Sequence, residues 1–130
     1  MQLPRSPREE KHDTLCEELL RERAAVLGRA GMAVEDALAE LTKLDNEIKT
    51  KKEQLKLLKL REQCPHSLNE QQAAVEEINA KIDQFNAVRK KAQLKYYYLI
   101  VTREALGLRR HDMIKEIYII PVKKKKIQDF

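Results

Sequence analysis

Apolar residues recur at an interval of seven along the first half of the chain. The longest unbroken series consists of Leu20, Leu27, Val34, Leu41, Ile48 and Leu55. This interval places the side chains on one face of an α-helix, and such a face is typical of helices that pack against other helices. The pattern therefore predicts a long helix over residues 12–62 with one apolar seam along it.

The apolar series is interrupted at residues 63–67, where we expect a turn. Pro65 disfavours a helical conformation of Cys64 before it. Ser67 followed by Glu70 has the spacing of a capping box, which marks the start of a helix. These signals predict that a second helix begins near residue 68.

The second helix is expected to end at residue 106, because Gly107 is typical of the position that follows a helix. Its apolar heptad positions are Val75, Ile78, Ile82, Phe85, Ala92, Tyr96 and Leu99. A short break between two such helices favours an antiparallel pair. The expected fold is therefore all-α, with a long antiparallel helical hairpin (a coiled coil) over residues 12–106.

A register centred on the predicted turn brings apolar residues of the two helices face to face. It pairs Leu55 with Ile78, Ile48 with Phe85, Leu41 with Ala92, Val34 with Leu99, and Leu27 with Leu106. The basic stretch 48–61 then lies opposite the mostly acidic stretch 69–83, and flanking charges of this kind set orientation and register. The predicted hairpin seam consists of Leu27, Val34, Leu41, Ile48, Leu55, Leu58, Val75, Ile78, Phe85, Ala92, Tyr96, Leu99 and Leu106.

Apolar residues outside this seam are candidates for binding partner proteins. The leucines near residues 15–20 extend beyond Leu106 and have no counterpart in the second helix. Tyr97 lies off the seam, and tyrosine is enriched in protein interfaces. The predicted partner-binding residues are Leu15, Leu19, Leu20, Tyr97, Val101, Ile117, Ile119 and Ile120.

The two ends of the chain are expected to differ from the hairpin. Residues 1–11 contain two prolines among charged residues and predict a flexible arm, with the helix N-cap at Asp13 or Thr14. Residues 107–122 predict a short helix and then an extended or β-like docking segment at 117–122. That segment either adds a strand to another subunit's sheet or packs at the open end of the hairpin, near Leu15, Leu19 and Leu20.

Residues 123–130 form a basic tail. Its basic residues are Lys123, Lys124, Lys125 and Lys126. Three interpretations are open: a disordered, solubilising end; a nuclear import signal; or a contact with nucleic acid or an acidic partner.

Composition agrees with a long-helix protein. Charged residues make up 36% of the chain, with only three glycines and four prolines, which is typical of long helices and coiled coils. A thin hairpin buries little core for its length, so we expect a partner. The sequence shows neither a signal peptide nor a membrane span, which predicts an intracellular protein, cytoplasmic and/or nuclear, with no membrane association.

The sequence offers little chemistry. It contains no P-loop, no glycine-rich dinucleotide turn and no HExxH motif. Cys64 and His66 lie close together, but a zinc site needs about four ligands. We therefore expect no catalytic residues, no metal ligands and no cofactor.

One junction resembles a known family. The Leu106-Gly107-Leu108 stretch closes the long helix, and residues 117–120 follow like a first strand. This layout is similar to that of the small coiled-coil subunits of the outer-kinetochore microtubule-binding complex. The resemblance covers residues 106–120, and the globular domain that follows in that family has no counterpart before Phe130. No functional residue is carried over from it.

These observations predict a non-enzymatic coiled-coil subunit that scaffolds or bridges a multiprotein intracellular complex by helix–helix packing. Its expected partners are other helical subunits or a second copy of the chain. The alternative is a small nuclear protein, associated with chromosomes or nucleic acid, that uses the basic tail.

Overall fold

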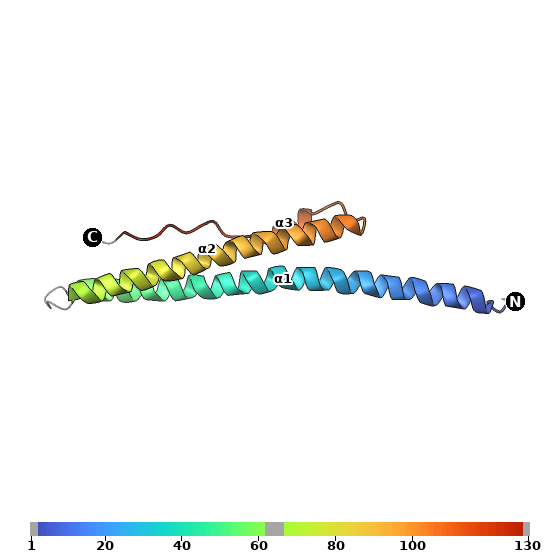
Figure 1. The fold of residues 1–130 in the computed structure, drawn as a ribbon, viewed down its shortest axis with the longest axis horizontal. Helices are drawn as coiled ribbons and strands as arrows, with labels where there is room; N and C mark the ends of the chain where they lie inside the picture. Colours follow the sequence, from blue (N-terminus) through green and yellow to red (C-terminus); the bar gives the residue numbers. More distant parts are fainter. Residues whose placement is uncertain (1–2, 62–66, 129–130) are drawn as a thin grey trace.

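A computed structural model describes residues 3–61 and 67–128 of the chain. Its elements are α1 (Pro7–Leu60), α2 (Ser67–Ala105) and α3 (Asp112–Ile117), and the described residues contain no strand. The two long helices pack against each other and run in opposite directions (Figure 1). The predicted all-helical fold with two long packed helices is confirmed.

The first helix begins earlier than the sequence predicted. Residues 7–11 were expected in a flexible arm, but α1 starts at Pro7. The Ser6 hydroxyl accepts a hydrogen bond from the Glu9 backbone N–H at 3.2 Å. Proline is favoured at the first position of a helix, because the backbone N–H that proline lacks has no hydrogen-bond partner within the helix at that position. The N-cap is therefore Ser6 rather than Asp13 or Thr14.

The second helix ends at Ala105, just before Gly107. Gly107 has a φ of 86°, in the left-handed region that is accessible to glycine at little cost. The N–H of Leu108 donates to the Arg103 carbonyl at 2.9 Å, and that of Gly107 donates to the Glu104 carbonyl at 3.0 Å. This pair of hydrogen bonds forms a Schellman motif, which closes α2 after Ala105. Of the predicted turn at 63–67, only Ser67 is among the described residues.

The core is a single row of apolar side chains between α1 and α2. Its largest fully buried members are Phe85, Leu41, Ile48, Ile78, Ile82 and Val34. Ion pairs flank the row: Lys51 lies 3.0 Å from Glu77, and Lys81 lies 3.1 Å from Glu47. Each pair joins the two helices, as expected for charges that set the register.

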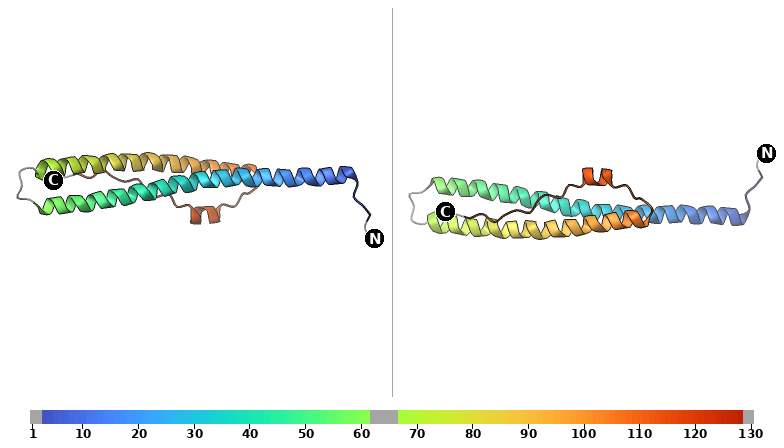
Figure 2. Two further views of the ribbon diagram at one scale, coloured as in Figure 1. Left: turned by 90° about the horizontal axis from the view of Figure 1, so that it is seen from below. Right: turned by 90° about the horizontal axis from the view of Figure 1, so that it is seen from above.

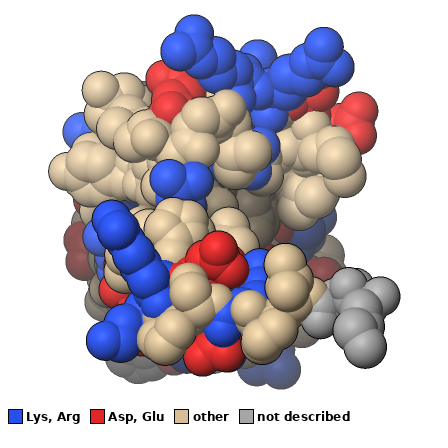
Figure 3. Space-filling model, turned by 90° about the vertical axis from the view of Figure 1, so that its right-hand side faces the viewer, with Lys and Arg blue, Asp and Glu red and all other residues tan. Residues whose placement is uncertain are grey.

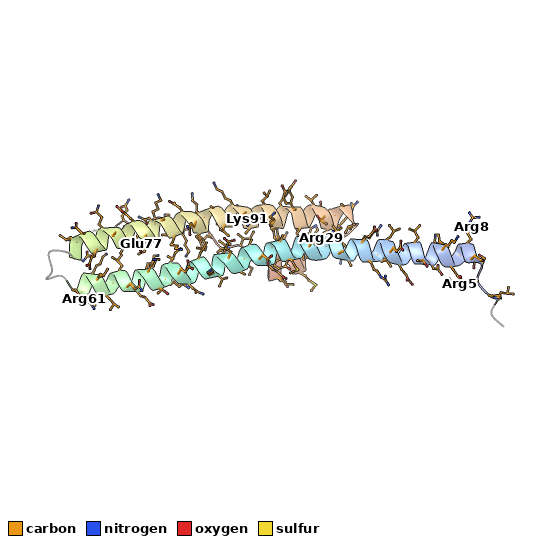
Figure 4. The ribbon with its side chains drawn as sticks, turned by 60° about the horizontal axis from the view of Figure 1, so that its bottom comes forward. Arg5, Arg8, Arg29, Arg61, Glu77 and Lys91 are labelled. Atoms are coloured by element: carbon orange, nitrogen blue, oxygen red, sulfur yellow. The ribbon has the colours of Figure 1, made fainter. Side chains whose placement is uncertain are left out.

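The helix α1 is longer than α2 and continues past its end. Figure 4 labels Arg29 beside the last turns of α2 and Arg8 well beyond them. We call residues 7–26 of α1 the overhang. Of its residues, Asp13 alone is half-buried and the others are exposed; Asp13 forms an ion pair with Arg5.

After α2 the chain reverses and returns along the hairpin. The short helix α3 stands out from the rod and buries none of its residues (Figure 2). Residues 118–128 belong to no helix or strand and run back toward the turn end of the hairpin (Figure 1). We call these residues the strap.

Candidate functional site

The predicted seam residues lie along the contact between the two helices, to different depths. Leu27, Leu58, Tyr96 and Leu106 are half-buried. The others are buried: Val34, Leu41, Ile48, Leu55, Val75, Ile78, Phe85, Ala92 and Leu99. Three further buried apolar residues, Ala37, Leu44 and Ile82, were not among the predicted seam residues. By the same register Leu44 lies opposite Arg89 and Ile82 lies opposite Lys51, so these two do not stand out in a pattern of apolar pairs.

The overhang carries the leucines for which the sequence offered no counterpart. Leu15 is 53% exposed, Leu19 is 47% exposed and Leu20 is 65% exposed. Val26 is exposed as well. Seen from the end of the rod in Figure 3, basic and acidic side chains lie among uncharged ones. The overhang is therefore a charged helix with an uncovered row of apolar side chains.

The remaining predicted partner-binding residues are distributed over α2, α3 and the strap. Tyr97 and Val101 are exposed on α2, and the Tyr97 ring packs obliquely on that of Tyr98, with 6.1 Å between centroids. Ile117 and Ile119 are also exposed. Ile120 differs from them, because it is half-buried and packs against the core of the hairpin.

The strap does not lie at the open end of the hairpin, and its addition as a strand to another subunit's sheet stays a prediction. Residues 117–122 are predicted as extended or β-like; in the structure Ile117 ends α3, and 118–122 belong to no helix or strand. Packing near Leu15 and Leu20 is wrong, because both leucines are exposed and the strap contacts α1 at Glu35 and Asp45. Reversal of the chain after Gly107 directs it away from the overhang.

Two asparagines of α2 bind the backbone of the strap. The Asn86 side-chain amide donates to the Lys124 carbonyl at 2.9 Å, and its oxygen accepts from the Lys124 N–H at 2.9 Å. Asn79 binds Ile127 in the same way, at 3.1 and 2.9 Å. Each amide therefore satisfies both polar groups of one strap residue, as a neighbouring strand would in a sheet.

A fifth hydrogen bond joins α2 to the strap at Pro121. Arg89 Nε donates to the Pro121 carbonyl at 2.7 Å. The bonded strap residues 121, 124 and 127 are thus three apart, and their partners follow one side of α2. Arg89 lies between Phe85 and Ala92, where the spacing of the apolar heptad series calls for an apolar residue, and its hydrogen bond to the strap explains a polar residue at this position.

Lys124 is the strap side chain with the closest partner on the hairpin. Its Nζ lies 2.6 Å from an Asp45 carboxylate oxygen and 4.8 Å from the centre of the Phe85 ring. The hydrogen bond from Lys124 lowers the pKa of Asp45 below its usual range; burial opposes this effect and Lys49 adds to it. The ammonium group is thus held by a carboxylate and an aromatic face together.

The rest of the predicted basic tail is less constrained. Lys126 lies 3.4 Å from Asp83, with both side chains largely exposed. Lys123 and Lys125 are exposed. The four lysines therefore alternate between two that point to hairpin carboxylates and two that face solvent.

The start of the strap is fixed by a tyrosine. The Tyr118 hydroxyl donates to the Glu35 carboxylate at 2.8 Å. This hydrogen bond raises the pKa of Tyr118 above its usual value, because ionisation would place two negative charges together. The strap is thus joined to both long helices.

The described residues offer few side chains that could bind a metal ion or act as a nucleophile. Within residues 3–61 and 67–128, no group of three His, Cys, Asp or Glu side chains is arranged to hold a metal ion. Cys16 Sγ lies 3.8 Å from His12 Nδ1 on the exposed overhang. The Cys64 and His66 pair lies outside the described residues.

Comparisons with known proteins found no match. No protein-family model, curated protein or solved structure matches the chain. In the part of the chain that the structure describes, no helix combines the length and apolar character needed to cross a bilayer.

Proposed function

We propose that this chain is a non-enzymatic subunit of an intracellular multiprotein assembly and acts through coiled-coil packing of its helices. The observation that carries the proposal is the overhang, where α1 continues past α2 with Leu15, Leu19 and Leu20 exposed. A helix of a partner, lying where α2 would continue, is the expected occupant of this surface.

Continuity of the seam supports this assignment. Leu20 belongs to the same seven-residue series as the buried residues Val34, Leu41 and Ile48. The face that packs on α2 in one half of α1 is therefore the face that is uncovered in the other. Covering one such leucine contributes about 1.5–3 kcal/mol, so a few of them make a useful anchor.

The lack of a neighbouring helix beside the overhang also favours a partner. A single helix of this length is marginally stable in water, because most helical stability in proteins comes from packing. The overhang has neither α2 nor the strap beside it (Figure 1). A partner helix would supply the missing packing, and charges of both signs beside the leucines would select its direction.

The test is a comparison of two variants at native expression level. Tagged wild-type chain is captured gently, and proteins recovered in near-equal amounts are identified. Leu19→Asp with Leu20→Asp should lose these partners, at unchanged thermal stability of the hairpin. Thr14→Asp is the control, because it adds a charge to the overhang away from the leucine stripe.

Two results would contradict the proposal. One is retention of the partners by the Leu19→Asp, Leu20→Asp chain. The other is recovery of the wild-type chain alone, with no change of its mass with concentration. If the chain instead dimerises and the double variant does not, the partner is a second copy.

The nucleic-acid alternative stays a prediction. Lys124 and Lys126 face Asp45 and Asp83, which reduces the positive charge that the tail offers to phosphates. Binding through Lys123 and Lys125 would weaken steeply with salt. Loss of a salt-sensitive interaction on removal of residues 123–130 would favour this function over helix packing.

A further inference from the structure

The face of the hairpin beneath the strap has the features of a peptide-binding site. Asn79 and Asn86 bind the strap through backbone atoms only, and Arg89 binds a backbone carbonyl. Such contacts recognise an extended chain without regard to most of its side chains. We infer that this face is a groove for an extended, lysine-containing peptide of a partner protein, and that the strap occupies it in the free chain.

The groove selects one side chain strongly. The site of Lys124 combines the Asp45 carboxylate at 2.6 Å with the Phe85 ring at 4.8 Å. A lysine satisfies both, since its methylene stem crosses apolar surface while its ammonium reaches the carboxylate. Three residues further on, Ile127 packs against the hairpin core, so the groove also favours an aliphatic residue there.

The strap leaves part of the groove unfilled. A hollow of about 400 Å³ lies between the hairpin and the strap. Its hairpin side is formed by Leu38, Leu41, Thr42, Asp45 and Phe85. Ile119 and Val122 border the hollow from the strap but remain largely exposed to solvent. A partner peptide with a bulkier apolar residue before its lysine would fill this space better than the strap does.

Charge also favours a basic peptide as the occupant. Glu35, Asp45 and Asp83 all face the strap. The strap competes as a tethered segment at a high effective concentration. An external peptide should therefore bind weakly until the strap is released. The short helix α3 precedes the strap and buries no residue, so it adds little to holding the strap in place. This site is separate from the overhang, so the inference stands whether or not the proposed function is correct.

The test uses the full chain and a labelled synthetic peptide with the sequence of residues 117–128. Lys124→Glu in the chain places a carboxylate against Asp45 and should release the strap. The labelled peptide is expected to bind this variant at least tenfold more tightly than the wild-type chain. Adding Asn86→Leu to the variant should remove most of this gain, because two hydrogen bonds to the peptide backbone are lost.

Two modified peptides separate backbone recognition from charge attraction. N-methylation at Ile127 removes the N–H that Asn79 accepts, and should weaken binding about tenfold. N-methylation at Lys125, whose N–H makes no hydrogen bond within the described chain, is the matched control and should weaken it much less. Equal effects of the two, or indifference to Asn86→Leu, would mean that the lysines bind by charge alone and would overturn the inference.

Hydrogen exchange at Lys124 and Ile127 of the chain reports whether the strap has left. Continued protection of both amides in the Lys124→Glu chain would overturn the inference, because Asp45 would not anchor the occupant. A released strap without peptide binding would overturn it too. A concentration-dependent dimer that the peptide dissociates would assign the groove to a second copy instead of a partner protein.

Discussion

Residues 34–55 of α1 lie against α2, and the strap covers one side of that pair, whereas the overhang projects beyond both (Figures 1 and 2). Leu41 and Leu20 occupy equivalent positions of one heptad series. Leu41 is 2% exposed and Leu20 is 65% exposed. A heptad pattern thus defines which face of a helix will pack, while the length of the neighbouring helix decides how much of that face is covered.

The largest expected effect comes from introducing an aspartate at an apolar position in each of the two regions. Ile48→Asp buries a charge at a position that is 1% exposed and should cost about 4 kcal/mol or more. Leu19→Asp in the overhang should change the free energy of unfolding by less than about 1 kcal/mol. Thermal melting followed by circular dichroism compares them. Equal destabilisation by the two would mean that the overhang is packed in the isolated chain.

A smaller effect is expected from acid, and only in the strapped region. The pKa of Asp45 is lowered by its hydrogen bond from Lys124, so its contribution to holding the strap is full above the usual aspartate pKa of about 3.9. It is lost as pH falls below that value, because the protonated carboxyl no longer pairs with Lys124. Exchange protection at Lys124 should fall in this range.

The Asp45→Asn chain is the control for that titration. Its strap should be held less firmly at pH 7, and protection at Lys124 should depend less on pH below 4. Protection that falls equally in both chains would assign the acid effect to other carboxylates. Exchange in the overhang, corrected for the intrinsic rate, should not follow the Asp45 titration.

The smallest effect is expected at the boundary between the two regions. Gly28 lies within α1, and a Cβ built on it meets no atom within 4 Å. Gly28→Ala should therefore stabilise the helix by about 1 kcal/mol, measured as a rise in melting temperature. A loss of stability would show that this part of α1 needs a kink or a close approach.

The sequence predicted the two helices, their packing and the end of α2, because these depend on local signals. The seven-residue interval and Gly107 act within a few turns of helix. The start of α1 differs from the prediction because two prolines among charged residues indicate a flexible arm, although a proline directly after Ser6 holds a position that a helix accepts.

The path of the strap could not be predicted in this way. It depends on hydrogen bonds between residues far apart in the chain, such as Asn79 with Ile127 and Asn86 with Lys124. Such bonds use backbone groups, which leave no pattern in the sequence. The available signal was the two asparagines, which are one heptad apart and directly follow the stripe residues Ile78 and Phe85.

The central claim is that the overhang binds a helix of a partner protein. Its most direct test is to compare amide hydrogen exchange of the free chain with that of the chain bound to the proteins that co-purify with it. Amides of residues 34–55 should be protected in both states, because α2 covers them. Amides of residues 15–26 should exchange rapidly in the free chain and become protected in the complex. Equal exchange of residues 15–26 in the two states would contradict the claim that the overhang binds a partner helix.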